Sequence, residues 1–204
     1  MTVQEVIDMA KYGELQNLGT STNVSQILSY LNLGVLELYK RFPLKVEEHI
    51  ITLVEGQSIY TMPADMMWIV AAYEEVSEDD AVSYTKIIPI NKEEDVKSLN
   101  TISWNQVQVP LVTNGAYISV IYVAAPETYT ENDLEETLEI PLQMVEALLG
   151  YMAFRAHSAI NSGDEEARVL YQEFEASCDR LLTKGMFNQD DLYMSDRIKD
   201  KGFV

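Results

Sequence analysis

The chain has 204 residues, enough to bury a substantial core, and its apolar fraction of 47% excludes a wholly disordered chain. No apolar run approaches the roughly 20 residues of a membrane-spanning helix, and the N-terminus lacks the charged start and apolar block of a secretory signal. Asp and Glu total 33 against 14 Lys and Arg, a net charge of −19, so the surface should repel a nucleic-acid backbone. Two interpretations of this charge remain open: it keeps the protein soluble, or it belongs to a surface that lies near nucleic acid without binding it. The charge alone does not distinguish these two roles.

The N-terminal residues predict a short helix. Thr2 and Glu5 have the spacing of a capping box, and apolar residues then follow a helical period as far as Gly13. A polar loop rich in Ser, Thr and Gly follows, so we expect this helix to end there.

A second, longer helix is predicted to begin after Asn23, an N-cap residue. A strong apolar stripe covers residues 24–42, and Pro43 ends the helix because the residue before a proline is pushed out of the α region. Leu33 and Leu36 lie off this stripe. We therefore expect the helix to be buried on two sides, with Leu33 and Leu36 as candidate subunit-interface residues.

From Val46 the hydrophobic period becomes that of β-strands. Asn114–Gly115 predicts a hairpin turn, and residues 92–99 are compatible with a short helix. Extended segments are predicted at 49–54, 58–60, 66–73, 84–90, 106–112 and 117–124.

Two further helices are predicted between Pro141 and Leu182, joined by a tight turn. Pro141 suits a helix start, and Ser162 with Glu165 has capping-box spacing at the start of the second helix. Each helix carries one apolar stripe, so the pair should lie antiparallel with the stripes facing each other. The single cysteine, Cys178, falls on the second stripe, which predicts a buried core thiol and excludes an intrachain disulfide.

These elements predict an α+β fold with a four-helix bundle body, a mainly antiparallel β-rich insertion and an extended C-terminal tail. The bundle would comprise residues 1–45 and 141–184, the insertion residues 46–140, and the tail residues 185–204. The tail has no sustained period, and docking on its own domain and docking on a partner remain open. Its large apolar side chains are the candidate portal- or partner-binding residues: Met186, Phe187, Leu192, Tyr193, Met194, Phe203 and Val204.

The sequence contains no pattern that predicts catalysis, a metal site or a cofactor. His49 and His157 are the two histidines, and neither has a partner at metal-ligand spacing. Phosphate-binding glycine loops and a nucleophile elbow are absent from the sequence, and the adjacent acidic pairs lie in expected loops. We therefore predict that the protein is not an enzyme and has no catalytic or metal-binding residues and no cofactor.

A run of motifs in fixed order resembles the head–tail adaptor, or connector, proteins of tailed bacteriophages. In that family a strand–turn–strand of the form I-x-L-x-x-G-x-x-x-Y-x-x-P-x-D follows an N-terminal helical region, and the matching residues are Ile51, Leu53, Gly56, Tyr60, Pro63 and Asp65. The resemblance covers roughly residues 20–182. It continues through Asn114, Gly115, Tyr122, Pro126, Leu138, Ile140, Pro141, the segment 151–157, Tyr171 and Phe174.

The resemblance implies a virion structural protein, made in the host cytoplasm and located in the neck between capsid and tail. Adaptors of this kind form a closed homo-oligomeric ring, usually of twelve subunits, below the portal protein. The ring continues the DNA conduit, so DNA passes through without specific binding, and it docks tail or further neck proteins. In several members a C-terminal extension binds the portal, which gives residues 186–204 a candidate role. No membrane is involved.

Two alternatives remain open on the sequence alone. A tail-tube or tail-completion protein of a phage would share the acidic charge and the lack of a catalytic motif. An enzyme or small-molecule binder would need a deep pocket with convergent polar groups, for which the sequence offers no candidate.

Overall fold

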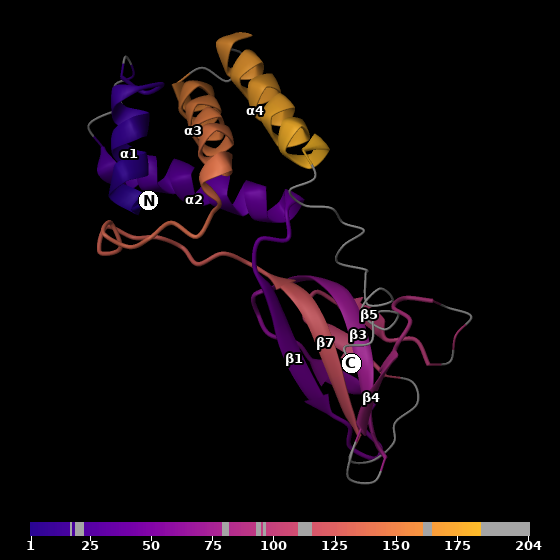
Figure 1. Cartoon of the computed structure of the whole chain (residues 1–204). Coiled ribbons are helices and arrows are strands. Elements are labelled where there is room, and N and C mark those ends of the chain that lie inside the picture. Colours follow the sequence, from indigo (N-terminus) through magenta and orange to yellow (C-terminus); the bar gives the residue numbers. More distant parts are fainter. Residues whose placement is uncertain are drawn as a thin grey trace. The chain divides into compact units, whose positions relative to one another are not determined.

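The structure is a computed structural model (Figure 1), and it describes residues 1–16, 18, 23–78, 82–92, 95, 97–109, 116–160 and 165–184. The side chains of residues 75–78 and 82–85 are outside this description. The described chain divides into a helical unit, formed by Met1–Leu44 and the described part of Pro126–Asn188, and a β unit, Lys45–Ala125. None of the described helices combines the length and the apolar character needed to cross a membrane.

The first helix, α1 (Val3–Tyr12), begins with the predicted capping box. The Thr2 hydroxyl accepts a hydrogen bond from the Glu5 backbone N–H, and the Glu5 carboxylate accepts one from the Thr2 backbone N–H. The helix ends at Gly13, whose N–H donates to the Met9 carbonyl oxygen. A Cβ at Gly13 would lie 2.8 Å from that oxygen, so the close approach requires glycine.

The second helix, α2 (Val24–Arg41), also follows its sequence signals. The Asn23 side chain accepts a hydrogen bond from the Gln26 backbone N–H at 3.2 Å, and the chain turns extended at Phe42, before Pro43. The predicted cap and end of this helix are confirmed. Its buried face consists of Ile27, Leu28, Tyr30, Leu31, Gly34, Val35, Leu38 and Tyr39.

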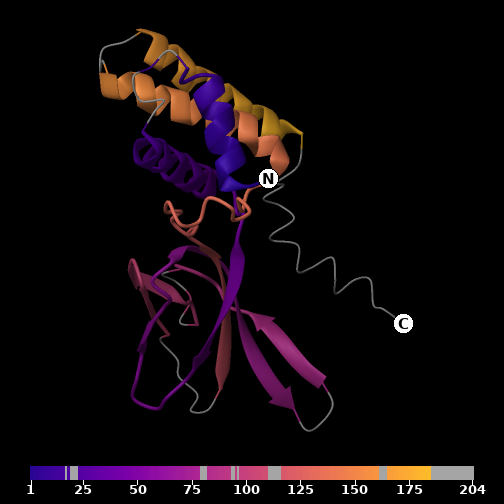
Figure 2. The same ribbon diagram turned by 90° about the vertical axis from the view of Figure 1, so that its left-hand side faces the viewer.

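The last two helices form the predicted antiparallel pair. After Pro141 the short 3₁₀ helix η2 (Leu142–Met144) leads into α3 (Val145–Ile160), and α4 (Glu165–Thr183) lies beside α3 in Figures 1 and 2. Cys178 is buried in α4, as predicted. The proposed Ser162 cap lies outside the described residues. Aromatic rings fill the contact between the helices, with centroids from 4.9 to 6.0 Å apart: Tyr151, Phe154, Tyr171 and Phe174.

The prediction of a four-helix bundle body is wrong. In such a bundle the helices lie about 20° from parallel or antiparallel. Figure 1 shows that α2 instead lies across the direction of α1, α3 and α4. Among the described elements α3 contacts each of the other three helices, and its contacts with α4 and α2 are the most extensive. The class is still α+β, but the helical unit is organised around α3.

Two local features explain the crossing of α2. At Gly34 a Cβ would lie 2.5 Å from Leu148 Cδ1, so glycine lets the α2 backbone approach the side chains of α3 closely. In addition, α2 packs against residues 126–140, a segment without regular secondary structure whose Tyr129 and Leu138 are buried. Part of the α2 surface therefore contacts this segment, whereas in a four-helix bundle it would contact another helix.

The β unit consists of two antiparallel sheets in the described part of the chain. The larger sheet has the order β1-β7-β3-β4 and is formed by β1 (Val46–Thr52), β3 (Met66–Glu78), β4 (Val82–Ile87) and β7 (Tyr117–Ala124). The smaller sheet has the order β2-β6-β5 and is formed by β2 (Ile59–Thr61), β5 (Asn100–Ser103) and β6 (Gln106–Gln108).

One apolar core lies between the two sheets. It buries side chains from both sheets and their connections, which include Ile51, Leu53, Tyr60, Met62, Ala72, Leu99, Val107, Val109, Ile118, Val120 and Tyr122. We call the side of the larger sheet that faces this core the inner face, and the opposite side the outer face.

Most predicted strands are present, with shifted bounds. The segment 117–124 coincides with β7, whereas β5 was not predicted. The short helix suggested for residues 92–99 is absent from its described part, where a turn at Lys97 leads into a bridge between Ile90 and Leu99. The predicted Asn114–Gly115 turn lies outside the described residues.

Candidate assembly surfaces

The described residues contain no cluster that could perform chemistry at a metal. No group of three or more His, Cys, Asp or Glu side chains among them could hold a metal ion. His157 Nδ1 lies 3.6 Å from a Glu166 carboxylate oxygen, and the half-buried His49 belongs to β1.

The motif shared with the phage adaptors builds a tight turn between β1 and β2. Gly56 has a φ of +82°, a conformation that side chains disfavour. The Tyr60 hydroxyl accepts a hydrogen bond from the Val54 N–H at 2.9 Å and donates one to the Gln57 carbonyl oxygen at 2.9 Å. The glycine and the tyrosine of the motif thus have a structural role.

The outer side of α2 carries the candidate interface residues. Leu33 is 39% exposed and Leu36 is half-buried, so both reach the surface of the helical unit. The exposed Ser25 and Ser29 precede them on the same side, at spacings of about one helical turn. Because Val24–Leu36 contains no charged residue, this side of α2 is neutral in a chain with a net charge of −19.

The connection from β7 to η2, residues 126–140, forms a strongly acidic surface. We call this segment the acidic loop. It contains no Lys or Arg, and none of its acidic residues forms an ion pair with a described residue. The exposed acidic side chains are Glu127, Glu131, Glu135, Glu136 and Glu139.

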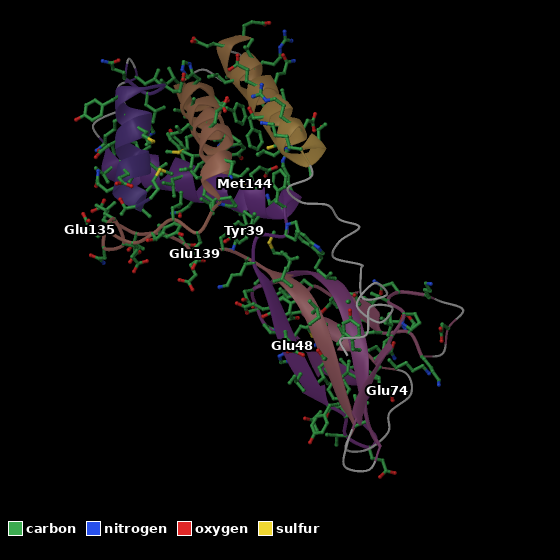
Figure 3. The ribbon with its side chains drawn as sticks, in the orientation of Figure 1. Tyr39, Glu48, Glu74, Glu135, Glu139 and Met144 are labelled. Atoms are coloured by element: carbon green, nitrogen blue, oxygen red, sulfur yellow. The ribbon has the colours of Figure 1, made fainter. Side chains whose placement is uncertain are left out.

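Two buried tyrosines, Tyr39 of α2 and Tyr129 of the loop itself, fix the backbone of the acidic loop. The Tyr39 hydroxyl donates to the Glu139 carbonyl oxygen, and the Glu139 N–H donates to the Tyr129 hydroxyl, both at 3.0 Å. Burial, together with the charge of Glu139, raises the pKa of Tyr39 to about 12, so this donor stays protonated. Figure 3 shows Glu135 and Glu139 along the loop, with Tyr39 close to Glu139.

Further backbone contacts attach the acidic loop to α1 and α2. The Asn32 side chain donates to the Tyr129 carbonyl oxygen at 2.8 Å and accepts from the Tyr129 N–H at 2.9 Å. The Val3 N–H donates to the Glu136 carbonyl oxygen at 3.0 Å, and Thr2 forms a bridge with Thr137. The loop is therefore held along its length, and its carboxylates stay close together.

An ion-pair cluster fixes α2 to α4. Arg41 donates to both Glu175 oxygens, at 2.8 and 2.5 Å, and its guanidinium lies 4.7 Å from the centre of the Phe174 ring. Glu37 is a further partner of Arg41 on α2, at 3.3 Å. Hydrogen bonds from Arg41 and then Tyr171 hold the pKa of Glu175 at about 2, well below its usual value.

A groove of about 480 Å³ opens between α1, α3 and α4. Its wall combines apolar side chains with Glu14, Glu146, Glu173 and Arg180. Arg180 lies 3.6 Å from Glu146 across the α3–α4 contact, and both side chains are well exposed. The apolar part of the wall includes Met9, Leu149, Leu170 and Phe174.

The outer face of the larger sheet carries several exposed apolar side chains. These are Val46, Ile50, Ile87 and Tyr117, with exposed fractions from 42 to 55%. Glu48 is the acidic residue of β1 on this face, and it accepts a short hydrogen bond from the Ser119 hydroxyl. Figure 3 labels Glu48 on β1. It also labels Glu74 of β3, which is paired with the core residue Ile118 and therefore belongs to the inner face.

The amino-acid sequence did not indicate this sheet face. The exposed residues of β1 alternate with inward ones, but Ile51, which points to the core, is as apolar as Ile50, which does not. The alternation of polar and apolar residues along β1 therefore did not indicate which of its two faces is exposed. The predicted partner-binding residues of the tail, Met186, Phe187, Leu192, Tyr193, Met194, Phe203 and Val204, lie outside the described residues.

The chain belongs to the SU10 adaptor protein family, whose model matches residues 1–198. No curated protein matches the chain. The family match confirms the resemblance to phage head–tail adaptors, and this family consists of structural adaptor proteins, which indicates a virion component.

Proposed function

We propose that the protein is a head–tail adaptor that forms a ring, of twelve subunits, below the portal protein in the neck of the virion. The ring continues the DNA conduit from the portal and docks tail or further neck proteins. The observation that carries this proposal is the match of residues 1–198 to the SU10 adaptor protein family. The neutral and acidic faces of the described units are consistent with it, because ring assembly and DNA passage need surfaces of opposite character.

Leu33 and Leu36 are proposed to contact a neighbouring subunit. In a ring each subunit uses two different faces, so a helix can be buried by its own chain on one side and by a neighbour on the other. The neutral outer side of α2 suits such a contact, since copies with a net charge of −19 repel one another where acidic side chains meet.

The acidic loop is proposed to face the DNA path. Fixed carboxylates near a phosphate backbone prevent adhesion, because no cations are present to displace the counterions of the DNA. Replacing Glu131, Glu135, Glu136 and Glu139 by Gln should slow or stall DNA ejection. Ejection that is unchanged at low salt would contradict this placement.

The C-terminal residues 186–204 are proposed to bind the portal. Their large apolar residues could act as anchors that become ordered on the partner. A chain truncated after Gly185 should still assemble with itself but should bind the portal more weakly.

The direct test is the mass of the purified protein, alone and mixed with the portal protein encoded with it, with electron microscopy of the product. A ring that caps the portal is the expected result. A monomer that ignores the portal but binds tail components would contradict the adaptor function and would favour a tail-component role.

A further inference from the structure

The larger sheet of the β unit ends in two strand edges that have no neighbour among the described strands. Its order places β1 at one edge and β4 at the other. β1 pairs with β7 over 7 residues without a bulge, and its sequence contains neither Pro nor Lys. Proteins usually protect a free edge with Pro, Lys or other charged side chains, or with a bulge. β1 carries only the negative charges of Glu47 and Glu48 among these devices, so it is suited to pairing with a strand that offers a cation.

The hydrogen bonds of β1 show which backbone groups are free. The Leu53 N–H donates to the Ala116 carbonyl oxygen, and the Lys45 carbonyl oxygen accepts from the Ala124 N–H, both at 2.9 Å. In an antiparallel strand, successive residues direct their N–H and C=O groups to alternate sides. The residues that direct theirs away from β7 are therefore Val46, Glu48, Ile50 and Thr52.

The same reasoning applies to β4. The Ile88 N–H donates to the Ala72 carbonyl oxygen at 2.8 Å, so Lys86, two residues earlier, also directs its backbone groups towards β3. Ile87 and Thr85 direct theirs to the open edge. Both edges therefore carry backbone donors and acceptors that no described strand pairs.

The two edges are complementary in direction. All three pairings in this sheet are antiparallel, so in a sheet of four strands β1 and β4 run in opposite directions. A second copy in the same orientation can place its β1 beside β4 and continue the antiparallel order. In an antiparallel sheet with an odd number of strands the two edge strands would run in the same direction, so the contact between two such copies would be parallel.

The two edges are also complementary in face. Across the sheet Ile50 pairs with Ser119, Ser119 with Tyr73, and Tyr73 with Ile87. Paired residues place their side chains on one face. Ile50 and Ile87 thus share the outer face, and both have free backbone groups, as hydrogen-bonded partners in antiparallel strands require.

We propose that copies of this chain join edge to edge, with β4 of one copy pairing antiparallel with β1 of the next. This inference rests on the ring proposed above and specifies which surfaces meet in it. Such a contact uses two different faces, so it can repeat around a closed ring.

Charge complementarity favours a second copy as the partner and selects the register. Lys86 on β4 and Glu47 on β1 both lie on the inner face and both direct their backbone groups into their own sheet. Opposite each other they would form an ion pair between copies. This register also places Ile87, 45% exposed, opposite Val46, 42% exposed. A cation and an anion meet, and two apolar side chains are covered.

The partners that Glu47 already has keep it ionised for this contact. It accepts a hydrogen bond from the Tyr122 hydroxyl at 3.0 Å and lies 3.3 Å from the Lys45 ammonium. Both carboxylate oxygens have these partners, but the Glu47 side chain is still 39% exposed and can accept a further cation from solvent. Lys86 is paired with Glu74 of β3 on the same face, but no described carboxylate oxygen lies within 4.0 Å of its ammonium.

Disulfide trapping tests both the edges and the register. The double variant Val46→Cys with Ile87→Cys places one thiol on each edge, and directly paired residues have Cα atoms about 5.5 Å apart, within disulfide range. Mild oxidation of the full chain, alone and with the portal, should give a ladder of covalent multimers on a non-reducing gel. The native Cys178 can stay, because burial raises the pKa of its thiol to about 11.

The matched control is Ile50→Cys with Ile87→Cys. Ile50 is 55% exposed on the same strand, but in the proposed register it lies four residues, roughly 13 Å, from the position opposite Ile87. This pair should give at least tenfold less crosslinked product. Equal ladders from both pairs would show unspecific collision and would overturn the proposal.

A second pair of variants tests the edge without cysteine chemistry. Ile50→Lys adds an edge-protecting charge and should lower the assembled fraction at least tenfold. Ile102→Lys makes the same change on β5, at a position that is 46% exposed, and should assemble like the unaltered chain. Circular dichroism should show both variants folded. Equal assembly of the two variants would contradict edge pairing.

The outcomes separate this inference from the proposed function. Rings on the portal with a ladder from the Val46→Cys, Ile87→Cys pair support both. Rings without that ladder overturn the edge contact and leave the adaptor function standing. Neither rings nor a ladder would overturn both.

Discussion

The acidic loop and the β1 edge are two exposed surfaces with opposite character. The loop concentrates carboxylates that form no ion pairs with described residues, whereas the exposed side of β1 carries one carboxylate, Glu48, among β-branched residues. Each lies in a different unit of the chain. In a protein with a net charge of −19, surfaces with few acidic groups are the ones where copies can meet at low electrostatic cost.

The two surfaces are held in different ways, the acidic loop by side-chain hydrogen bonds and the β1 edge by strand pairing. Tyr39, Tyr129 and Asn32 bind the loop backbone through buried or half-buried hydrogen bonds, which keep its carboxylates together despite their repulsion. The β1 edge needs no such support, because its other side is paired with β7 throughout. The difference indicates that the fold maintains a concentrated negative surface.

The largest effect is expected from Tyr129→Ala. This change empties a buried site, since Tyr129 is 7% exposed, and it removes the acceptor for the Glu139 N–H. We expect a loss of about 3 to 5 kcal/mol in the free energy of unfolding, measured by urea denaturation. If the loss stayed below about 1 kcal/mol, the loop would not depend on this anchor.

The control Tyr129→Phe keeps the ring and removes only the hydroxyl. The expected loss is about 1 to 2 kcal/mol, the usual cost of one part-buried hydrogen bond with a stranded donor. Equal losses for the two variants would mean that the hydroxyl, and not the packing of the ring, holds the loop.

A smaller loss of stability is expected from Glu175→Gln, which removes a carboxylate that forms an ion pair with Arg41. Because the folded-state pKa of Glu175 is about 2, against an ordinary value of 4.5, its ionisation contributes stability that is complete above pH 4.5 and is lost as the pH falls towards 2. The variant should be about 1 kcal/mol less stable at pH 7, a value suited to a partly exposed pair. As the pH falls from 4.5 towards 2, the variant should therefore lose less stability than the unaltered chain does.

The matched control is Glu173→Gln, an exposed glutamate on the same helix. Its stability should match that of the unaltered chain at pH 7 and at pH 3. The measurement is thermal unfolding followed by circular dichroism across this pH range. A control that loses as much as Glu175→Gln would show that net charge, and not the Arg41 pair, causes the effect.

The smallest stability effect is expected from neutralising the acidic loop with Gln at positions 131, 135, 136 and 139. These side chains are exposed and repel one another, so the change should be neutral or stabilising by up to about 1 kcal/mol at low salt. The unaltered chain should gain stability between 0.01 and 0.15 M salt, since screening shortens the Debye length from roughly 30 to 8 Å. The variant should gain less. Identical salt responses would contradict repulsion within the loop.

The sequence by itself determined most elements of the chain. Local chemistry sufficed for the capping box of Thr2 and Glu5, the cap at Asn23, the helix end before Pro43 and the span of β7. Such signals act over a few residues, so they are visible without knowledge of the fold. The adaptor resemblance, through Gly56 and Tyr60, likewise depended on a local turn.

The arrangement of these elements depended on contacts between residues far apart in sequence. The crossing of α2 over α3 needs Gly34 to meet Leu148, and the position of the acidic loop needs Asn32 to reach Tyr129. The bundle prediction failed because apolar periodicity reports that a helix face is buried, but not what buries it. For the same reason only the strand order showed that β1 is an edge, because pairing partners are chosen by tertiary contacts and not by strand propensity.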